Sequence, residues 1–136
     1  VKGLKRNPNS YSLYYNMGIT LFDMNRYEDA AEAFGSAVEI KSDEYEVYYY
    51  HGLALTQIER YGEAAEAYRK AVKYKPDYSE CYYNLAAVYS VMRKYDAALE
   101  NLRKAVELDQ DLKDEAKADK VFNVLREKPE FEEMFS

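Results

Sequence analysis

Apolar and small residues across residues 11–112 follow helical spacing, in short segments that come in pairs. In residues 11–23 such side chains stand three or four positions apart, with polar residues between them. Asn25 and Arg26 interrupt this pattern, and a second segment rich in alanine follows. Small side chains on the facing side of a helix let an antiparallel partner approach closely. The pattern therefore predicts pairs of antiparallel helices.

The paired pattern returns with a period of 34 residues. Tyr14, Tyr48 and Tyr82 form one series at this spacing. Other positions repeat in the same register: Leu21, Leu55 and Tyr89; Tyr27, Tyr61 and Tyr95; Ala30, Ala64 and Ala98; Ala37, Ala71 and Ala105. An unbroken period of this length predicts an array in which each unit buries a face against the next. We expect an all-α chain with three repeats at 11–44, 45–78 and 79–112.

Residues 1–10 continue the register backwards. Gly3 and Leu4 fall 34 residues before Ala37 and Val38, so small and apolar positions are kept. We interpret residues 1–10 as the tail of a preceding repeat or a linker, and the chain as an excerpt or processed product of a longer protein. An ordinary N-terminal tail is the alternative. Asn9 or Ser10 is expected to cap the first helix of the first repeat.

Residues 113–136 are expected to close the array. Residues 113–127 predict one helix, with Ala118, Val121, Phe122 and Leu125 on its apolar face. Asp111 and Asp114 fit a cap at its start, as Asp77 does for the first helix of the third repeat. Lys128-Pro129 should break the helix before a short closing turn. An open array must hide its last apolar face, and a one-sided helix does this.

Composition fits a folded domain that does not bind nucleic acid. The chain has 136 residues, 48% of them hydrophobic, which is enough for one domain with a core. Its net charge is −6 and no segment forms a strong basic patch, which disfavours nucleic acid and anionic membranes. The longest nearly apolar run, residues 47–55, is far shorter than the roughly 18 residues of a membrane span. No signal peptide is visible, and the compartment is left open.

Catalytic and metal chemistry has no support in the sequence. Cys81 is the only cysteine and takes a place held elsewhere by apolar residues, so we expect a buried core thiol. His51 is the only histidine and aligns with Met17 and Leu85, so we expect a partly buried packing residue. One histidine without a partner cysteine builds neither a usual zinc site nor a catalytic triad. We expect no enzyme activity, no cofactor and no metal.

The repeated residues resemble those of the tetratricopeptide repeat (TPR) family, whose pattern is W-x2-L-G-x2-Y, then A-x3-F, a small residue and Pro. The matching residues are Tyr14, Met17, Gly18, Leu21, Ala30, Phe34 and Ala37; Tyr48, His51, Gly52, Leu55, Ala64, Tyr68, Ala71 and Pro76; Tyr82, Leu85, Ala86, Tyr89, Ala98, Leu102 and Ala105. Ser42 and Gln110 replace the proline in the first and third repeats. The resemblance implies an α-α superhelix, or solenoid, of three helix pairs with a C-terminal capping helix.

The resemblance also implies a concave groove lined by the first helix of each pair. The residues expected to line it are Ser12, Tyr15, Asn16, Ile19, Glu46, Tyr49, Tyr50, Leu53, Glu80, Tyr83, Asn84 and Ala87. The tyrosines among these positions make such a groove aromatic, in a chain with 16 tyrosines and no tryptophan. Tyrosine offers rigid contact area and a hydroxyl for a peptide backbone. Equally, Tyr15, Tyr49 and Tyr83 could pack helix to helix, and for Tyr14 and its equivalents that is the favoured interpretation.

We therefore expect a non-catalytic protein-interaction module that holds a peptide or helical segment. Glu46 and Glu80 favour a basic or neutral segment. One subfamily grips acidic chaperone tails with a cationic clamp, and this chain lacks those cations, so no such docking is expected. Two alternatives are an assembly element that self-associates or stacks through its array ends, and a small chaperone for a secreted client.

Overall fold

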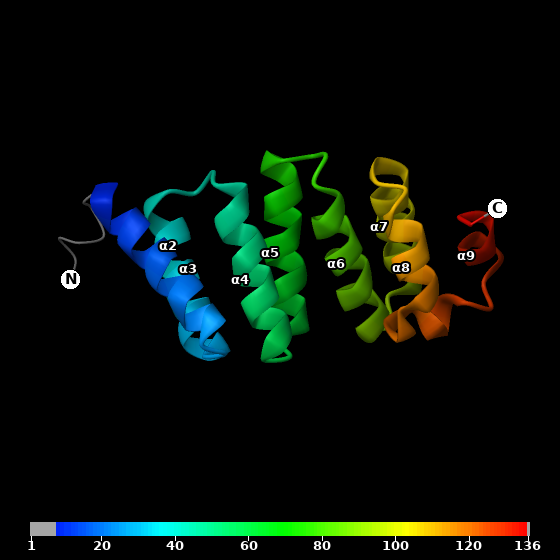
Figure 1. Ribbon diagram of the computed structural model, residues 1–136, viewed down its shortest axis with the longest axis horizontal. Helices are drawn as coiled ribbons and strands as arrows, with labels where there is room; N and C mark the ends of the chain where they lie inside the picture. Colours follow the sequence, from blue (N-terminus) through cyan, green and yellow to red (C-terminus); the bar gives the residue numbers. More distant parts are fainter. Residues whose placement is uncertain (1–7, 136) are drawn as a thin grey trace. The chain divides into compact units, whose positions relative to one another are not determined.

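The computed structural model describes residues 8–135, with side chains from Ser10 onward. Every regular element within this range is a helix (Figure 1), so the all-α prediction is confirmed. The chain divides between Lys75 and Pro76 into two compact units, which we describe separately. The proposed tail, residues 1–10, lies largely outside the described range and stays a prediction.

Unit 1 contains two helix pairs. They are α2 (Pro8–Asp23) with α3 (Tyr27–Ile40), and α4 (Tyr45–Gln57) with α5 (Tyr61–Tyr74). Helix α3 also packs against α4, which joins the two pairs into one body. Helix α5 ends ahead of Pro76, and Lys75 is extended, with φ −139° and ψ 84°, as a residue before proline prefers. Lys41 has nearly the same conformation without a proline after it, so the helix end does not require Pro76.

Unit 2 contains one further pair and the C-terminal segment. Helix α6 (Ser79–Val91) packs against α7 (Tyr95–Leu108). The segment beyond consists of α8 (Leu112–Ala118), the 3₁₀ helix η1 (Lys120–Leu125) and α9 (Pro129–Glu133). Helix α8 contacts α7, and η1 contacts α6. The C-terminal residues therefore pack on the helix pair α6–α7 within unit 2.

The capping segment is not the single helix expected over 113–127. Asp119 adopts an extended conformation, with φ −77° and ψ 118°, and separates α8 from η1. Its side chain accepts a hydrogen bond from the Val121 N–H at 3.0 Å, and its carbonyl accepts one from Arg126 at 3.0 Å. These bonds compete with continued α-helix. Phe122 and Leu125 are fully buried as predicted, whereas Ala118 is exposed.

Of the predicted helix caps, Asp111 alone stands at the N-cap position of a described helix. Helix α2 already begins at Pro8, so Ser10 lies inside it, and its buried hydroxyl has no hydrogen-bond partner in the described residues. The N-cap position of α6 is Tyr78 rather than Asp77. Asp111 stands at the start of α8 without a capping bond, and its N–H donates to the Asp109 carboxylate at 3.0 Å. Short polar side chains near a helix start thus indicated the boundary only approximately.

The turn inside each helix pair has the same left-handed geometry. Asn25, Glu59 and Arg93 stand 34 residues apart and have φ of 63°, 61° and 63°. The N–H of Arg26 donates to the Leu21 carbonyl, and the two later turns repeat this bond. That is a Schellman motif, in which the left-handed position usually holds glycine. Asparagine tolerates this conformation, whereas glutamate and arginine adopt it at a cost.

The two helices of a pair touch most closely at a glycine. A Cβ added to Gly18 would lie 2.5 Å from Cε1 of Phe34, and one added to Gly52 would lie 2.6 Å from Cε1 of Tyr68. Carbon atoms cannot approach so closely, so these rings require glycine opposite them. In the third pair the same positions hold Ala86 and Leu102, both fully buried. The smaller leucine leaves room for the alanine methyl group.

His51 and Cys81 are packing residues, as predicted. Cys81 is fully buried, and burial raises the pKa of its thiol to about 12. His51 is mostly buried and faces Gly35 of α3, at 3.7 Å from where a Gly35 Cβ would stand. The pKa of His51 is lowered to about 4, and burial is the largest cause. The charges of Arg60 and Lys70 also lower this pKa, whereas that of Glu63 raises it. Neutral imidazole is thus the folded form at neutral pH.

The glycine–aromatic contact gives the first prediction. Gly52→Ala should destabilise the protein by about 1–3 kcal/mol, because the added methyl group collides with the Tyr68 ring. Tyr68→Leu reproduces the third pair, so adding Gly52→Ala to it should cost nothing or stabilise the helix. Urea denaturation of wild type, both single variants and the double variant measures this coupling. Additive effects would show that the ring does not require the glycine.

The buried histidine gives the second prediction. Its folded pKa lies below its ordinary value of 6.5, so its contribution to stability is present above pH 6.5 and is lost as pH falls toward 4. The free energy of unfolding should fall by about 2 kcal/mol between pH 7 and pH 5, a range that lies above the ordinary pKa values of Asp and Glu. His51→Met, the residue that stands at position 17, should remove this fall. The same fall in the variant would assign it to other groups.

Candidate functional site

A stacked tyrosine pair stands on the first half of α2 in unit 1. The Tyr11 and Tyr15 ring centroids are 6.2 Å apart, with an angle of 1° between the ring planes. Tyr15 also lies 6.2 Å from Phe34 and 6.4 Å, edge-on, from Tyr50. Tyr11, Tyr15 and Tyr50 are each half-buried. Packing therefore fixes these rings in position while part of their surface stays accessible.

Carboxylates from the α3–α4 turn and the start of α4 surround this pair. Burial is the largest cause that raises the pKa of Tyr11 to about 12, and Glu44, Glu46 and Asp43 add to it. For Tyr15 burial and then Glu46 have the same effect, also to about 12. Both rings thus lie in a negative field. We call Tyr11, Tyr15, Asn16, Glu46 and Tyr50 the aromatic–acidic face.

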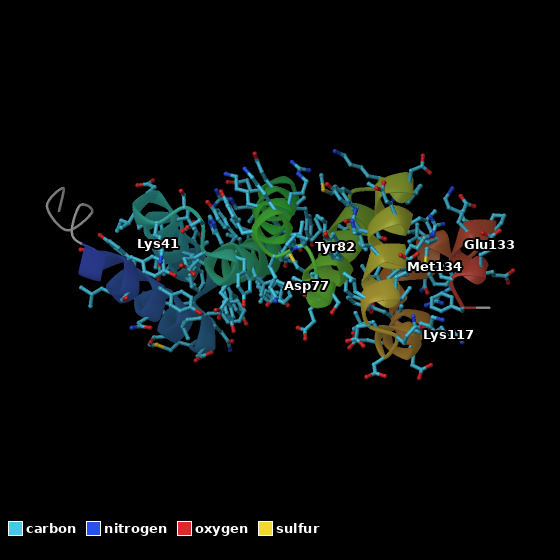
Figure 2. The ribbon with its side chains drawn as sticks, turned by 90° about the horizontal axis from the view of Figure 1, so that it is seen from above. Lys41, Asp77, Tyr82, Lys117, Glu133 and Met134 are labelled. Carbon is cyan, nitrogen blue, oxygen red and sulfur yellow. The ribbon has the colours of Figure 1, made fainter. Side chains whose placement is uncertain are left out.

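A lysine of the protein already lies against this face. The Lys41 ammonium, labelled in Figure 2, pairs with Glu44 at 2.7 Å and stands 5.7 Å from the centroid of the Tyr11 ring. Lys75 stands in the same way 5.2 Å from the Tyr45 ring, one period later. Cations are attracted to the faces of aromatic rings. The face is therefore chemically suited to a positively charged side chain.

The predicted groove residues of unit 1 differ in accessibility. Ser12, Asn16 and Glu46 are exposed, and Tyr15, Ile19, Tyr50 and Leu53 are half-buried. Tyr49 is only 8% exposed, because its ring packs 6.0 Å from Tyr68 and 5.8 Å from Tyr50. For Tyr49 the packing alternative therefore describes the side chain better than the groove-lining one.

In unit 2 Tyr83 also packs inward. It is 7% exposed, and its hydroxyl donates a hydrogen bond to Oδ2 of Asp119 at 2.8 Å. Its ring meets Phe122 edge-on, with centroids 5.4 Å apart. Burial first, and then the Asp119 carboxylate, raise its pKa. Tyr83 thus fixes the C-terminal segment to α6, while Glu80 is exposed and Asn84 and Ala87 are half-buried.

The tyrosines equivalent to Tyr14 serve packing, as the sequence favoured. The Tyr48 hydroxyl donates to the Ser42 carbonyl at 2.9 Å. Tyr82, labelled in Figure 2, donates from its hydroxyl to the Pro76 carbonyl at 3.0 Å. Both rings are buried. A buried hydroxyl needs a partner, and a loop carbonyl supplies one here. These bonds explain part of the tyrosine excess without a ligand.

Within residues 10–135, no group of three or more His, Cys, Asp or Glu side chains is placed to hold a metal ion. Among the described helices, none combines the length and the apolar character that crossing a membrane requires.

Solved structures share this architecture. A crystal structure of MamA matches with a TM-score of 0.83 and 25% identity, over 98% of this chain and 79% of that chain. The TPR2AB domain–pHSP90 complex of yeast Sti1 matches at 0.72 and 18%, over 97% and 49%. The CopN–Scc3 complex matches at 0.72 and 17%, over 95% and 69%. At these lower identities, the last two similarities show the fold alone.

Family models give the same assignment from sequence. Two models described as tetratricopeptide repeat match residues 15–79 and residues 79–112. No curated protein matches the chain. TPR modules bind other proteins, and they are generally scaffolds without catalytic activity of their own. The chain belongs to the tetratricopeptide repeat family.

Proposed function

We propose that this protein binds an extended segment of a partner protein on the aromatic–acidic face, and that the segment carries lysine or arginine. The stacked Tyr11 and Tyr15 rings within a field of carboxylates support this most directly. The rings offer flat contact area, and the exposed Glu46 offers a charge partner. Asn16 is exposed beside them and can pair with a peptide backbone as both donor and acceptor.

The burial of Tyr49 and Tyr83 leaves fewer of the predicted groove residues accessible to such a partner. The rings of Tyr49 and Tyr83 are held within their own units, so substituting them changes the fold as well as any surface. Asn16 and Glu46 are exposed and can be changed without loss of core packing. Ser12, Ile19 and Leu53 extend the proposed face within unit 1, and Glu80, Asn84 and Ala87 remain candidates in unit 2.

The proposal predicts selective binding of a basic peptide. The probe is a fluorescein-labelled decapeptide with three arginines separated by glycine and alanine, and its counterpart has glutamates in their place. Asn16→Ala/Glu46→Gln should weaken binding of the arginine peptide about tenfold, because it removes one charge partner and one backbone partner. Fluorescence anisotropy at low salt measures the affinities.

The matched control is Glu32→Gln, which removes an exposed charge from α3. It should bind the arginine peptide as wild type does. Equal weakening by Glu32→Gln would show that the loss of affinity comes from the change in net charge and not from the aromatic–acidic face. Preference for the glutamate peptide would overturn the proposal outright.

A second candidate function, self-association, is favoured by the outer side of α2. Leu13 is 60% exposed and Met17 is 50% exposed, whereas their equivalents Val47 and Leu85 are 0% and 2% exposed. Asp23 is the only charged residue within Pro8–Asp23, so little charge would be desolvated when a partner helix covers this side. Apolar patches of this kind commonly mark interfaces.

Self-association makes a separate prediction. Sedimentation velocity should show a concentration-dependent dimer for wild type and monomer for Met17→Lys, because a charge at this contact opposes burial. Gln57→Lys, at an exposed position at the end of α4, is the matched control for added charge. A monomeric wild type at every concentration would exclude this candidate.

A further inference from the structure

The turn before α7 breaks a charge pairing that the two earlier repeats keep. In those repeats a basic residue precedes the second helix and pairs with an acid three positions later, as Arg26–Asp29 at 2.7 Å and Arg60–Glu63 at 2.6 Å. The third repeat has Lys94 and Ala97 at these places. The methyl group of Ala97 cannot neutralise the ammonium of Lys94. One cation is therefore left without the partner that its equivalents have.

Two further cations converge on the same place. Arg93, Lys94 and Lys128 line an open concavity of about 460 Å³ in unit 2, together with Tyr95, Asp96 and Ala97. The Lys128 ammonium lies 5.5 Å from the centroid of the Tyr95 ring, which holds it beside the turn. Among the side chains of residues 10–135, no carboxylate forms an ion pair with any of the three. We call this site the basic concavity.

The charge balance at the basic concavity favours an anionic ligand. Three cations and the single carboxylate of Asp96 leave it positive, although the whole chain carries a net charge of −6. Like charges held close together repel one another until an opposite charge arrives. The Tyr95 ring adds a contact surface for a side-chain stem or a peptide. An acidic ligand would thus gain both charge pairing and contact area.

The shape of the site separates possible anions. The lining cations stand on an open surface, and Arg93 and Lys94 are exposed. A free phosphate ion would be poorly enclosed there, whereas a run of carboxylates could meet several cations at once. Multiple weak contacts along one chain add up in this way. An acidic peptide therefore fits better than a single small anion.

We propose that the basic concavity binds an acidic segment of a partner protein, with Arg93, Lys94 and Lys128 as its charge partners. This surface shares no residue with the aromatic–acidic face and has the opposite charge preference. Its residues are all in unit 2, so it does not depend on the proposed function of unit 1. The protein would accordingly hold a basic segment and an acidic segment at different places.

Restoring the missing acid tests the proposal. Ala97→Glu places a carboxylate where Asp29 and Glu63 stand in the other repeats, so it should pair with Lys94 and repel an acidic ligand. Ala97→Gln has nearly the same size and no charge. With a fluorescein-labelled hexaglutamate peptide at low salt, Ala97→Glu should weaken binding at least tenfold, and Ala97→Gln should bind within about twofold of wild type.

Charge removal provides the second arm. Lys94→Gln and Lys128→Gln should each weaken hexaglutamate binding about threefold or more, whereas Arg60→Gln, which removes an already paired cation, should leave it unchanged. Equal effects of Ala97→Glu and Ala97→Gln, or of Lys94→Gln and Arg60→Gln, would overturn the site. Displacement of the peptide by inorganic phosphate at equal charge concentration would overturn the assignment to an acidic segment.

These outcomes are independent of the aromatic–acidic face. Asn16→Ala/Glu46→Gln should leave hexaglutamate affinity within about twofold of wild type, and Ala97→Glu should leave the arginine peptide bound. Loss of one activity without the other identifies which of the two proposals fails.

Discussion

The contact between glycine and an aromatic ring sets the spacing of the helices in unit 1. Phe34 and Tyr68 lie where a Cβ on the opposite helix would stand, so each pair closes until the ring meets bare backbone. This approach decides which rows of α2 and α4 face inward and which remain half-buried. The aromatic–acidic face is one such remaining row. Its geometry therefore depends on residues that do not belong to it.

Tyrosine supports this arrangement in two ways. Tyr48 and Tyr82 bury their rings and give their hydroxyls to loop carbonyls, which joins the start of a helix to the turn before it. Tyr11 and Tyr15 stack against each other and keep part of their surface accessible. A residue with an apolar ring and a polar tip suits both settings. An excess of tyrosine is thus not in itself a sign of a binding groove.

Periodicity predicted the helix pairs well because packing partners repeat at a constant distance along the chain. It could not predict the break at Asp119, where local side-chain hydrogen bonds override a helical pattern of apolar residues. Nor could it distinguish Tyr15 from Tyr83, since the partner of Tyr83 is 36 residues away and outside the repeat. Lys128 reaches the basic concavity from the capping segment, which the register of the repeats does not describe. The sequence shows Ala97 where the earlier repeats have Asp29 and Glu63. Only the ion pairs that these two acids form in the structure show that Lys94 lacks an equivalent partner.

The turns inside the helix pairs have a consequence for how the protein folds. Glu59 and Arg93 occupy a left-handed conformation that opposes turn formation, while Asn25 occupies it with little strain. A helix hairpin with an unfavourable turn gains stability only after its side chains have docked. The α2–α3 hairpin has the most favourable turn of the three, so the order of assembly should run from this pair toward the C-terminus. The array thereby acquires a direction that its repeated architecture does not suggest.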